Sequence, residues 1–249
     1  MNRDTRLSLV IPVYNGAHSL RGSLAQLTAW LPRQPMGIEL VLVNDGSDPL
    51  TATMLHDFAA STSGVTLLVN QRNSGKGLAV ARGMVAARGR FRIFTDADLA
   101  YSLDDITDTL RQLEAGSDVV IACRVLPESR YDISPAFFRY LYTRHVMSRT
   151  FNWAVRHGLL PGILDTQAGL KGFTDRAAEI LFPRLTLRGF GFDVELLYIA
   201  RQHGLSITQK AVHYRYDREP STMRFARDAI TMLGDLVRIR WNSLRGRYR

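Results

Sequence analysis

Short apolar runs alternate with longer amphipathic stretches through the first half of the chain, which predicts a mostly parallel sheet covered by helices. Five runs have the length and β-branched content of strands: Leu7–Val13, Glu39–Asn44, Val65–Asn70, Arg92–Asp96 and Asp118–Cys123. Helical spacing separates these runs and covers Ala17–Leu31, Leu50–Ala60, Gly77–Ala87 and Leu103–Ala115. We therefore expect an α/β fold.

Polar or glycine-rich residues follow four of the five predicted strands. They are Asn15-Gly16, Asp45-Gly46-Ser47-Asp48, Arg72 to Gly77, and Asp96-Ala97-Asp98. In open α/β sheets, ligands bind outside the carboxyl ends of the strands. The order of these segments thus predicts a single ligand site at that edge of the sheet.

The second half of the chain is less regular. We expect a loop over Arg124–Ser134, then an amphipathic helix rich in aromatic residues and arginine over Pro135–His157. Leu170–Thr174 and Ser206–Tyr214 have the character of strands, with a helix over Phe192–His203 between them. From Met223 onward, apolar residues recur every three or four positions, which predicts a further helix.

The net charge narrows the class of binding partner. The 249 residues carry 32 Lys and Arg against 23 Asp and Glu, a net charge of +9, and 29 of the 32 cations are arginine. This excess favours a polyanionic partner, although a codon preference for arginine would also produce it.

A hydrophobic content of 46% excludes a disordered chain. The single cysteine, Cys123, excludes an internal disulfide, and we expect it to be a small core residue in a reducing compartment.

Two segments could bind a charged ligand. Asp96 and Asp98 follow an apolar strand, and such a pair can hold Mg²⁺ or Mn²⁺ against a diphosphate, or can simply cap the next turn. Lys76 lies between Gly75 and Gly77, where it could bind phosphate or remain a solvated lysine. The Walker-type phosphate loop is excluded, because Gly77 stands where that motif needs Ser or Thr.

Four segments, LSLVIPVYNG, VLVNDGSDP, NSGKGLAVARGM and FTDADL, resemble in order and spacing the inverting glycosyltransferases of family 2, which have the GT-A (Rossmann-like) fold. Asp165–Pro183 and Gly191–Arg201 are similar to the polyprenyl-phosphate hexosyltransferases, most of all to dolichyl-phosphate glucosyltransferases and then to dolichyl-phosphate mannose synthases. The resemblance implies inverting transfer of a hexose from a nucleotide sugar, preferably UDP-glucose, to polyprenyl or dolichyl phosphate. A GDP-mannose donor is the alternative.

The resemblance also implies roles on the donor side. The residues expected to bind the nucleotide sugar are Pro12, Tyr14, Asp45, Arg72, Lys76, Asp96 and Gln167. Asp98, with Asp96, would hold Mg²⁺ or Mn²⁺. Asp165, Thr166 and Gln167 would line the sugar site. Asp96, Asp98 and Asp193 are the expected catalytic residues, with Glu195 close to the reacting centre and Lys171 or Lys76 beside the leaving diphosphate.

A lipid monophosphate acceptor is already an anion at neutral pH, so cations should matter more than a general base. We expect Arg124, Arg144, Ser148 and Arg218 to bind the acceptor phosphate, while surface contacts with water or membrane phosphates are the alternative. The chain departs from its relatives at Gly16, where the family often has Glu. It also has Ala100 where mannose synthases usually carry Gln, which favours the glucosyltransferase branch.

The expected organisation is a catalytic domain over residues 1–222, with a nucleotide-binding half (about 1–124) and an acceptor-binding half (about 125–222). A basic amphipathic tail over 223–249 would follow. Pro135–His157 and Met223–Leu244 could lie at a membrane surface or pack on the sheet. The chain opens without a signal-peptide pattern and has no run of 18 apolar residues. We therefore expect a peripheral enzyme at the cytoplasmic face of a membrane. A separate membrane subunit would be a further partner.

Three other functions compete with this hypothesis. A glycosyltransferase acting on a hydroxyl acceptor stays open, but the processive subclass with a QxxRW motif does not fit, because Val237 stands at the glutamine position before Arg240-Trp241. A nucleic-acid-binding module would suit the charge, yet no recognised binding motif is present. An inactive nucleotide-sugar binder is disfavoured by the presence of Asp96, Asp98 and Asp165.

Overall fold

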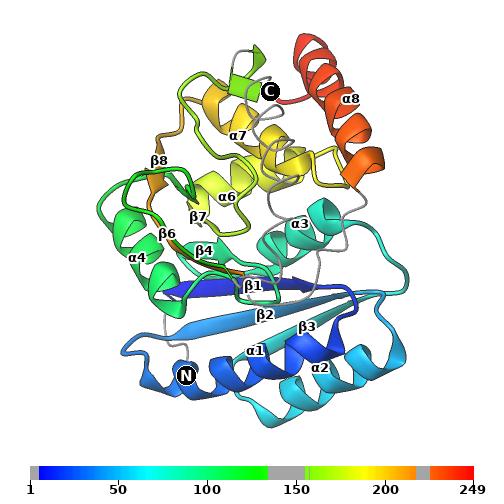
Figure 1. Cartoon of the computed structure of the whole chain (residues 1–249), viewed down its shortest axis with the longest axis vertical. Coiled ribbons are helices and arrows are strands. Elements are labelled where there is room, and N and C mark those ends of the chain that lie inside the picture. The colour runs from blue at the N-terminus through cyan, green and yellow to red at the C-terminus, as the bar shows by residue number, and fades with distance from the viewer. Residues whose placement is uncertain (1–5, 134–154, 157, 217–224) are drawn as a thin grey trace.

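The computed structural model describes residues 6–133, 155–156, 158–216 and 225–249 (Figure 1). The predicted helix over Pro135–His157 lies almost entirely outside these ranges. Among the described residues, no helix is both long enough and apolar enough to cross a membrane.

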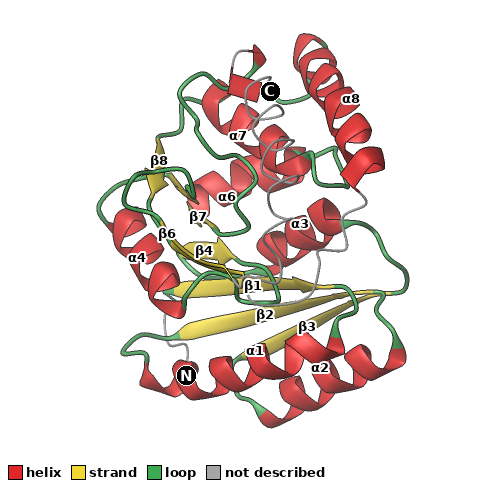
Figure 2. Cartoon of the chain, in the orientation of Figure 1, coloured by secondary structure: helices red, strands yellow, loops and turns green. Residues whose placement is uncertain are grey.

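A seven-stranded sheet forms the centre of the molecule (Figure 2). Its strands lie in the order β3 (Val65–Asn70), β2 (Ile38–Asp45), β1 (Leu7–Val13), β4 (Phe91–Phe94), β7 (Lys171–Thr174), β5 (Val119–Ala122) and β8 (Ile207–Lys210). Only β7 runs antiparallel to its neighbours, β4 and β5. The predicted mostly parallel α/β sheet is therefore confirmed, and the sheet joins the two halves of the chain.

Helices cover both faces of the sheet. One face carries α1 (Ala17–Trp30), α2 (Pro49–Ser61) and α4 (Leu103–Glu114), and the other carries α3 (Lys76–Ala86), α6 (Asp175–Leu181) and α7 (Phe192–Gln202). Short 3₁₀ turns follow α1 and α6 at Leu31–Arg33 (η1) and Phe182–Arg184 (η3). Since both faces are covered, β1 and the middle of β2 (Leu40–Val43) are apolar almost throughout, as buried parallel strands require.

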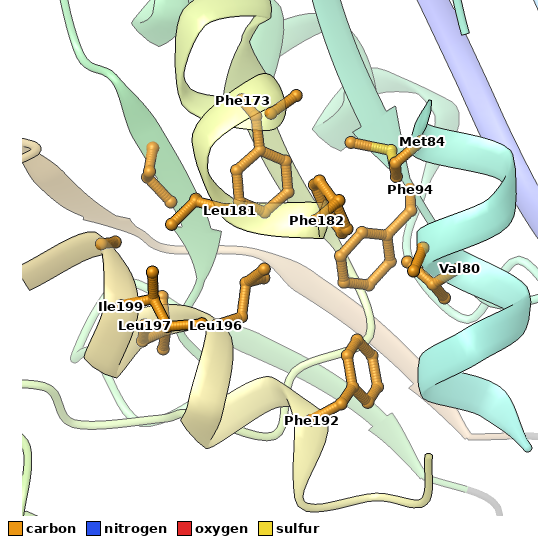
Figure 3. Close-up of a cluster of buried hydrophobic side chains, with 14 of the residues drawn as sticks. Val80, Met84, Phe94, Phe173, Leu181, Phe182, Phe192, Leu196, Leu197 and Ile199 are labelled. Carbon is orange, nitrogen blue, oxygen red and sulfur yellow. The ribbon is translucent and has the colours of Figure 1, made fainter. Parts of the chain in front are cut away.

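The core on the α3 side is rich in aromatic rings (Figure 3). The Phe94 ring on β4 lies 6.1 Å from that of Phe173 on β7 and 6.0 Å from that of Phe192 on α7. Phe173 also meets Phe182 edge-on at 5.1 Å. These contacts hold the start of α7 close to the ends of β4 and β7, which positions the site described below.

Local sequence signals explain where the helices begin. Asp48 caps α2 by accepting a hydrogen bond from the Thr51 amide, and Pro49 occupies the first helical turn. Ser102 and Asp105 form a reciprocal capping box at the start of α4. Asp104 and Asp105 are therefore first-turn acids of this helix.

Two predictions for the second half were wrong in detail. The expected loop over Arg124–Ser134 contains a strand, β6 (Arg130–Ile133), and the expected single strand over Ser206–Tyr214 is divided into β8 and β9 (His213–Tyr216). β6 and β9 pair with each other in a separate two-stranded sheet. β8 and β9 are separate strands because the chain leaves the large sheet between them. There the Val212 amide donates its hydrogen bond to the Ser129 hydroxyl instead of to a strand of the large sheet.

The helix predicted from Met223 onward is confirmed as α8 (Phe225–Leu244). It packs on α7, which the sequence pattern had left open. Ile239 and Tyr248 are buried in the core on the α3 side. The Tyr248 hydroxyl donates to Glu195 Oε1 at 2.7 Å, and Asn242 Nδ2 donates to Thr186 Oγ1 at 2.9 Å. A buried polar network thus fixes this end of the chain to α7.

Candidate active site

Three loops meet at the carboxyl ends of β1, β2 and β3. The Asn15 amide donates to Ser47 Oγ at 3.0 Å, and the Asp48 amide donates to Asn15 Oδ1 at 2.8 Å. Gly46 has a φ of +70°, and a Cβ there would lie 2.5 Å from the Arg72 carbonyl carbon. Only glycine allows this approach. The sequence prediction that these segments share one edge of the sheet is borne out by their contacts.

Asp45 is buried at the end of β2 and shapes the next loop. Its Oδ1 accepts hydrogen bonds from the Ser74 amide at 2.9 Å, the Ser74 hydroxyl at 2.5 Å and the Asn70 side chain at 2.6 Å. Its Oδ2 accepts from the Gly75 amide at 3.0 Å. Both carboxylate oxygens therefore hold the segment that leads into Lys76. The expected contact of Asp45 with a nucleobase stays a prediction.

Replacing Asp45 with Asn is expected to lower the free energy of unfolding by about 1–3 kcal/mol. It should also raise several-fold the KM for the sugar donor, the nucleotide sugar that the sequence resemblance implies. The amide group would present a donor to the Gly75 amide or to Ser74, which leaves a buried pair of donors unsatisfied. Urea unfolding and donor titrations measure the two effects. Asp57→Asn, the same change on the exposed surface of α2, is the matched control. An unchanged donor KM would show that the loop does not contribute to donor binding.

Lys76 begins α3 and forms an ion pair with the end of β4. Its Nζ lies 2.5 Å from Asp96 Oδ1. Burial alone lowers the pKa of the Lys76 ammonium, but Asp96, helped by Asp193 and Asp98, raises this pKa above its ordinary value. Asp96 also packs directly on Gly169, where a Cβ would lie 1.9 Å from Asp96 Oδ2. The site thus holds a permanent cation beside a group of carboxylates.

Asp98 lies in the turn after β4 and is exposed. It accepts a hydrogen bond from the Ala100 amide at 3.1 Å, and the following residue, Leu99, has a left-handed φ of +49°. In the described ranges, no three His, Cys, Asp or Glu side chains gather as a metal site. Mg²⁺ is often held by only one or two carboxylates, with phosphate oxygens and water completing its shell. Asp98 and Asp96 fit that donor set, with a diphosphate as the missing part.

A second, fully buried ion pair lies between β7 and α7. Lys171 Nζ donates to Asp193 Oδ1 at 2.5 Å and to the Ala168 carbonyl at 2.6 Å, and lies 5.5 Å from the centre of the Phe94 ring. Burial lowers the pKa of Lys171 and raises the pKa of Asp193, while the opposite charge of each partner offsets part of this cost. Lys171 therefore fixes Asp193 within electrostatic reach of Lys76.

Glu195, two residues after Asp193 in α7, has a structural role. Its carboxylate is buried and accepts hydrogen bonds from the Thr186 and Leu187 amides at 2.9 and 2.8 Å, in addition to Tyr248. The neighbouring Arg188 carbonyl accepts from the Gly77 amide at 2.8 Å. Glu195 thus organises the segment that supports the start of α3.

Arg124 and Asp165 form a bidentate ion pair beyond the end of β5. Arg124 Nε lies 2.7 Å from Asp165 Oδ2, and a terminal guanidinium nitrogen lies 3.0 Å from Oδ1. The guanidinium also lies 5.5 Å from the centre of the Tyr214 ring. Burial alone raises the pKa of Asp165, but Arg124 brings it below its ordinary value. Asp165 likewise raises the pKa of Arg124, against the effect of burial.

Polar groups without partners lie next to Asp165. Among the described residues, the Thr166 hydroxyl and the Gln167 side-chain nitrogen are buried and form no hydrogen bond. The Thr95 hydroxyl, directly before Asp96, shares this property. Buried polar atoms without a partner are uncommon in folded proteins. Thr95 is one such group that the sequence pattern did not reveal.

The remaining predicted site residues are placed as follows. Tyr14 and Arg72 are exposed on the loops after β1 and β3, and Pro12 is partly buried in β1. Arg144, Ser148 and Arg218 lie outside the described residues. Sequence reasoning also missed Ser74, Tyr101 and Tyr214: Tyr101 packs on Tyr214 at 5.3 Å, and its hydroxyl accepts from the Gly169 amide. No local pattern marks such contacts, because they join distant segments.

The mostly parallel sheet between two layers of helices has the GT-A architecture, which is a fold of glycosyltransferases. Residues 8–171 match the profile of glycosyl transferase family 2, and the chain belongs to this family. The resemblance inferred from the sequence motifs is thereby confirmed.

Two relatives show which members of the family this chain resembles. The dolichyl-phosphate beta-glucosyltransferase of Dictyostelium discoideum is 30% identical over 250 residues, which cover 96% of this chain and 75% of the relative. The enzyme of the same name from Saccharomyces cerevisiae is 31% identical over 257 residues, covering 98% of this chain and 76% of the relative. The similarity thus extends well beyond the family 2 segment and includes the second half of the chain.

Solved structures support the fold. Glucosyl-3-phosphoglycerate synthase from Mycobacterium tuberculosis, crystallised with Mn²⁺ and UDP-glucose, superposes with a TM-score of 0.66 at 18% identity. The match covers 94% of this chain and 79% of that chain. At this identity the comparison shows a shared architecture.

Proposed function

We propose that this protein transfers glucose from UDP-glucose to dolichyl phosphate or a similar polyprenyl phosphate, with inversion at the anomeric carbon. The observation that carries the proposal is the Lys76–Asp96 pair beside the exposed Asp98, at the strand edge where this fold binds ligands. It occurs in a chain similar, over nearly its whole length, to dolichyl-phosphate beta-glucosyltransferases.

The donor would be held by its diphosphate. Asp98 and Asp96 would bind Mg²⁺ or Mn²⁺, which, when bound, stabilises the negative charge that grows on the leaving nucleoside diphosphate. The Lys76 ammonium lies against Asp96 and can pair with the diphosphate from the α3 side. The hydrogen bonds that Asp45 accepts from the Ser74 and Gly75 amides fix the loop before Lys76, so Lys76 would be positioned before the sugar donor arrives. Tyr14 and Arg72 are the proposed contacts of the base.

The sugar would lie beside Asp165. The unpartnered Thr166 hydroxyl and Gln167 amide can exchange hydrogen bonds with sugar hydroxyls, which satisfies groups that are otherwise buried without partners. Asp193, fixed by Lys171, adds a negative charge near the reacting centre.

The acceptor needs no general base. A phosphate monoester carries a charge of about −1.5 to −2 at neutral pH, so its oxygen can attack the anomeric carbon without losing a proton. The enzyme must then hold two anions close together, which requires cations. Arg124, whose guanidinium is oriented by Asp165 and Tyr214, is the proposed acceptor ligand in the described chain, with Arg144, Ser148 and Arg218 as further ones.

Transfer assays with labelled UDP-glucose and GDP-mannose test this function directly. With Mg²⁺ and a short polyprenyl phosphate, we expect a β-linked glucosyl lipid phosphate from UDP-glucose, and loss of the product when the metal is chelated. The anomeric configuration follows from NMR of the product.

The matched acceptor control is the polyprenol of the same chain length, which lacks the phosphate. We expect no transfer to it. Efficient transfer to the polyprenol, or a product with retained configuration, would contradict the proposed mechanism. Turnover of GDP-mannose in place of UDP-glucose would contradict the proposed donor.

A further inference from the structure

Four large apolar side chains on one face of α8 are left uncovered by the rest of the described chain. Leu233, Val237, Trp241 and Leu244 are 51%, 72%, 54% and 74% exposed. We call these four residues the outer stripe. At 3.6 residues per turn, they fall within an arc of about 80° on the helix. A contiguous apolar surface of this kind is typical of an interaction site.

The opposite face of α8 is firmly held, so the outer stripe has a fixed position. Met232 and Ile239 are buried, and the Tyr198 hydroxyl on α7 donates to Ser243 Oγ at 3.0 Å. Asn242 and Tyr248 complete the buried network with Thr186 and Glu195. The inner face of α8 packs on the domain, so packing within the described chain does not involve the outer stripe.

Positive charge borders the outer stripe. Residues 231–249 contain five exposed arginines, Arg238, Arg240, Arg245, Arg247 and Arg249. Asp235 is the single acid in this segment and is half-buried. The Arg245 guanidinium lies over the Trp241 ring, 4.6 Å from its centre. Around the axis of α8, Arg240 lies at one edge of the outer stripe and Arg238 lies at the other edge.

We propose that the outer stripe and its bordering arginines dock on an anionic lipid bilayer, with α8 lying in the plane of the interface. Apolar residues that include Trp, flanked by arginines, are the composition of interfacial helices. Arginine pairs with lipid phosphate groups through its planar fork. A stable protein interface buries about 800 Å² on each partner, which is more than four side chains on a single helix offer. The charge of this segment therefore favours a lipid surface as the occupant.

Vesicle co-sedimentation of the full chain tests the surface without a sugar donor, so its outcome is independent of the proposed reaction. We expect binding to vesicles of phosphatidylcholine and phosphatidylglycerol, weak binding to phosphatidylcholine alone, and weaker binding at high salt. Val237→Glu and Leu244→Glu should each reduce the binding about tenfold or more. The matched control is Leu50→Glu, the same change at a site that is 62% exposed on α2, at the opposite end of the molecule (Figure 1).

A fluorescence measurement distinguishes contact with the acyl chains from simple charge attraction. Vesicles with brominated acyl chains should quench the tryptophan emission of the wild-type protein, and Trp241→Phe should remove most of this quenching while retaining an aromatic side chain. Absence of wild-type binding to anionic vesicles overturns the proposal, as does wild-type affinity in both glutamate variants. If those variants instead break up a dimer in light scattering and still bind vesicles, the occupant is a second copy of the chain.

Discussion

Replacing Asp98 with Asn is expected to reduce glucosyl transfer by about 100-fold or more, because it removes one of the two carboxylates proposed to hold the metal. The Asn side chain has nearly the same shape and can still accept the hydrogen bond from the Ala100 amide, so the turn after β4 should persist. Initial rates and calorimetric titration of Mn²⁺ in the presence of UDP measure the two effects.

Asp104→Asn is the matched control for this experiment. Asp104 is an exposed aspartate only six residues further along, in the first turn of α4, and the change in net charge is identical. We expect wild-type rates and wild-type Mn²⁺ binding from this variant. If Asp98→Asn also retained both, Asp98 would have no part in metal binding.

Replacing Arg124 with Ala is expected to lower the free energy of unfolding by about 3–5 kcal/mol, because the buried Asp165 carboxylate would lose its bidentate partner. Removing both partners in an Arg124→Ala/Asp165→Ala double variant should restore much of this stability. If Arg124 also binds the acceptor phosphate, the double variant should keep a raised KM for the lipid phosphate despite its recovered stability. Urea unfolding and acceptor titrations separate the structural role from the binding role, and a wild-type acceptor KM in the double variant would leave only the structural one.

The same ion pair predicts a pH dependence. Burial alone raises the pKa of Asp165, yet Arg124 holds it below its ordinary value in the folded protein. A carboxyl with a depressed pKa in the folded state contributes its full stability above its unfolded pKa and loses it as the pH falls through the folded value. The stability difference between wild type and Arg124→Ala should therefore be largest near neutral pH and shrink in acid. A difference that grows in acid would contradict this assignment.

Regular local patterns made the first half of the fold predictable. β1 and β3 coincide with the predicted runs Leu7–Val13 and Val65–Asn70, and the capping residues Asp48 and Ser102 lie where their helices begin. These features depend on hydrophobic period and on side chains that bond to nearby amides. The gathering of polar loops at one edge of the sheet follows from strand order, so it was predictable as well.

Contacts between distant segments were not predictable in this way. The Lys76–Asp96 and Lys171–Asp193 pairs each join two different elements, and the Tyr248–Glu195 hydrogen bond spans 53 positions. β6 and β9 have weak strand patterns of their own and become strands by pairing with each other. Non-local pairing of this kind depends on the whole fold more than on local propensity.

The sequence alone determined the class of sheet, the candidate carboxylates and lysine, and the similarity to the family 2 glycosyltransferases, since all of these are encoded in short ordered segments. Only the tertiary structure decided which charges pair. It also decided that Asp45 shapes the Lys76 loop, and that α8 buries one face while leaving Val237 and Trp241 exposed. The reason is that burial and ion pairing are properties of neighbours in space, which the packing of distant segments brings together.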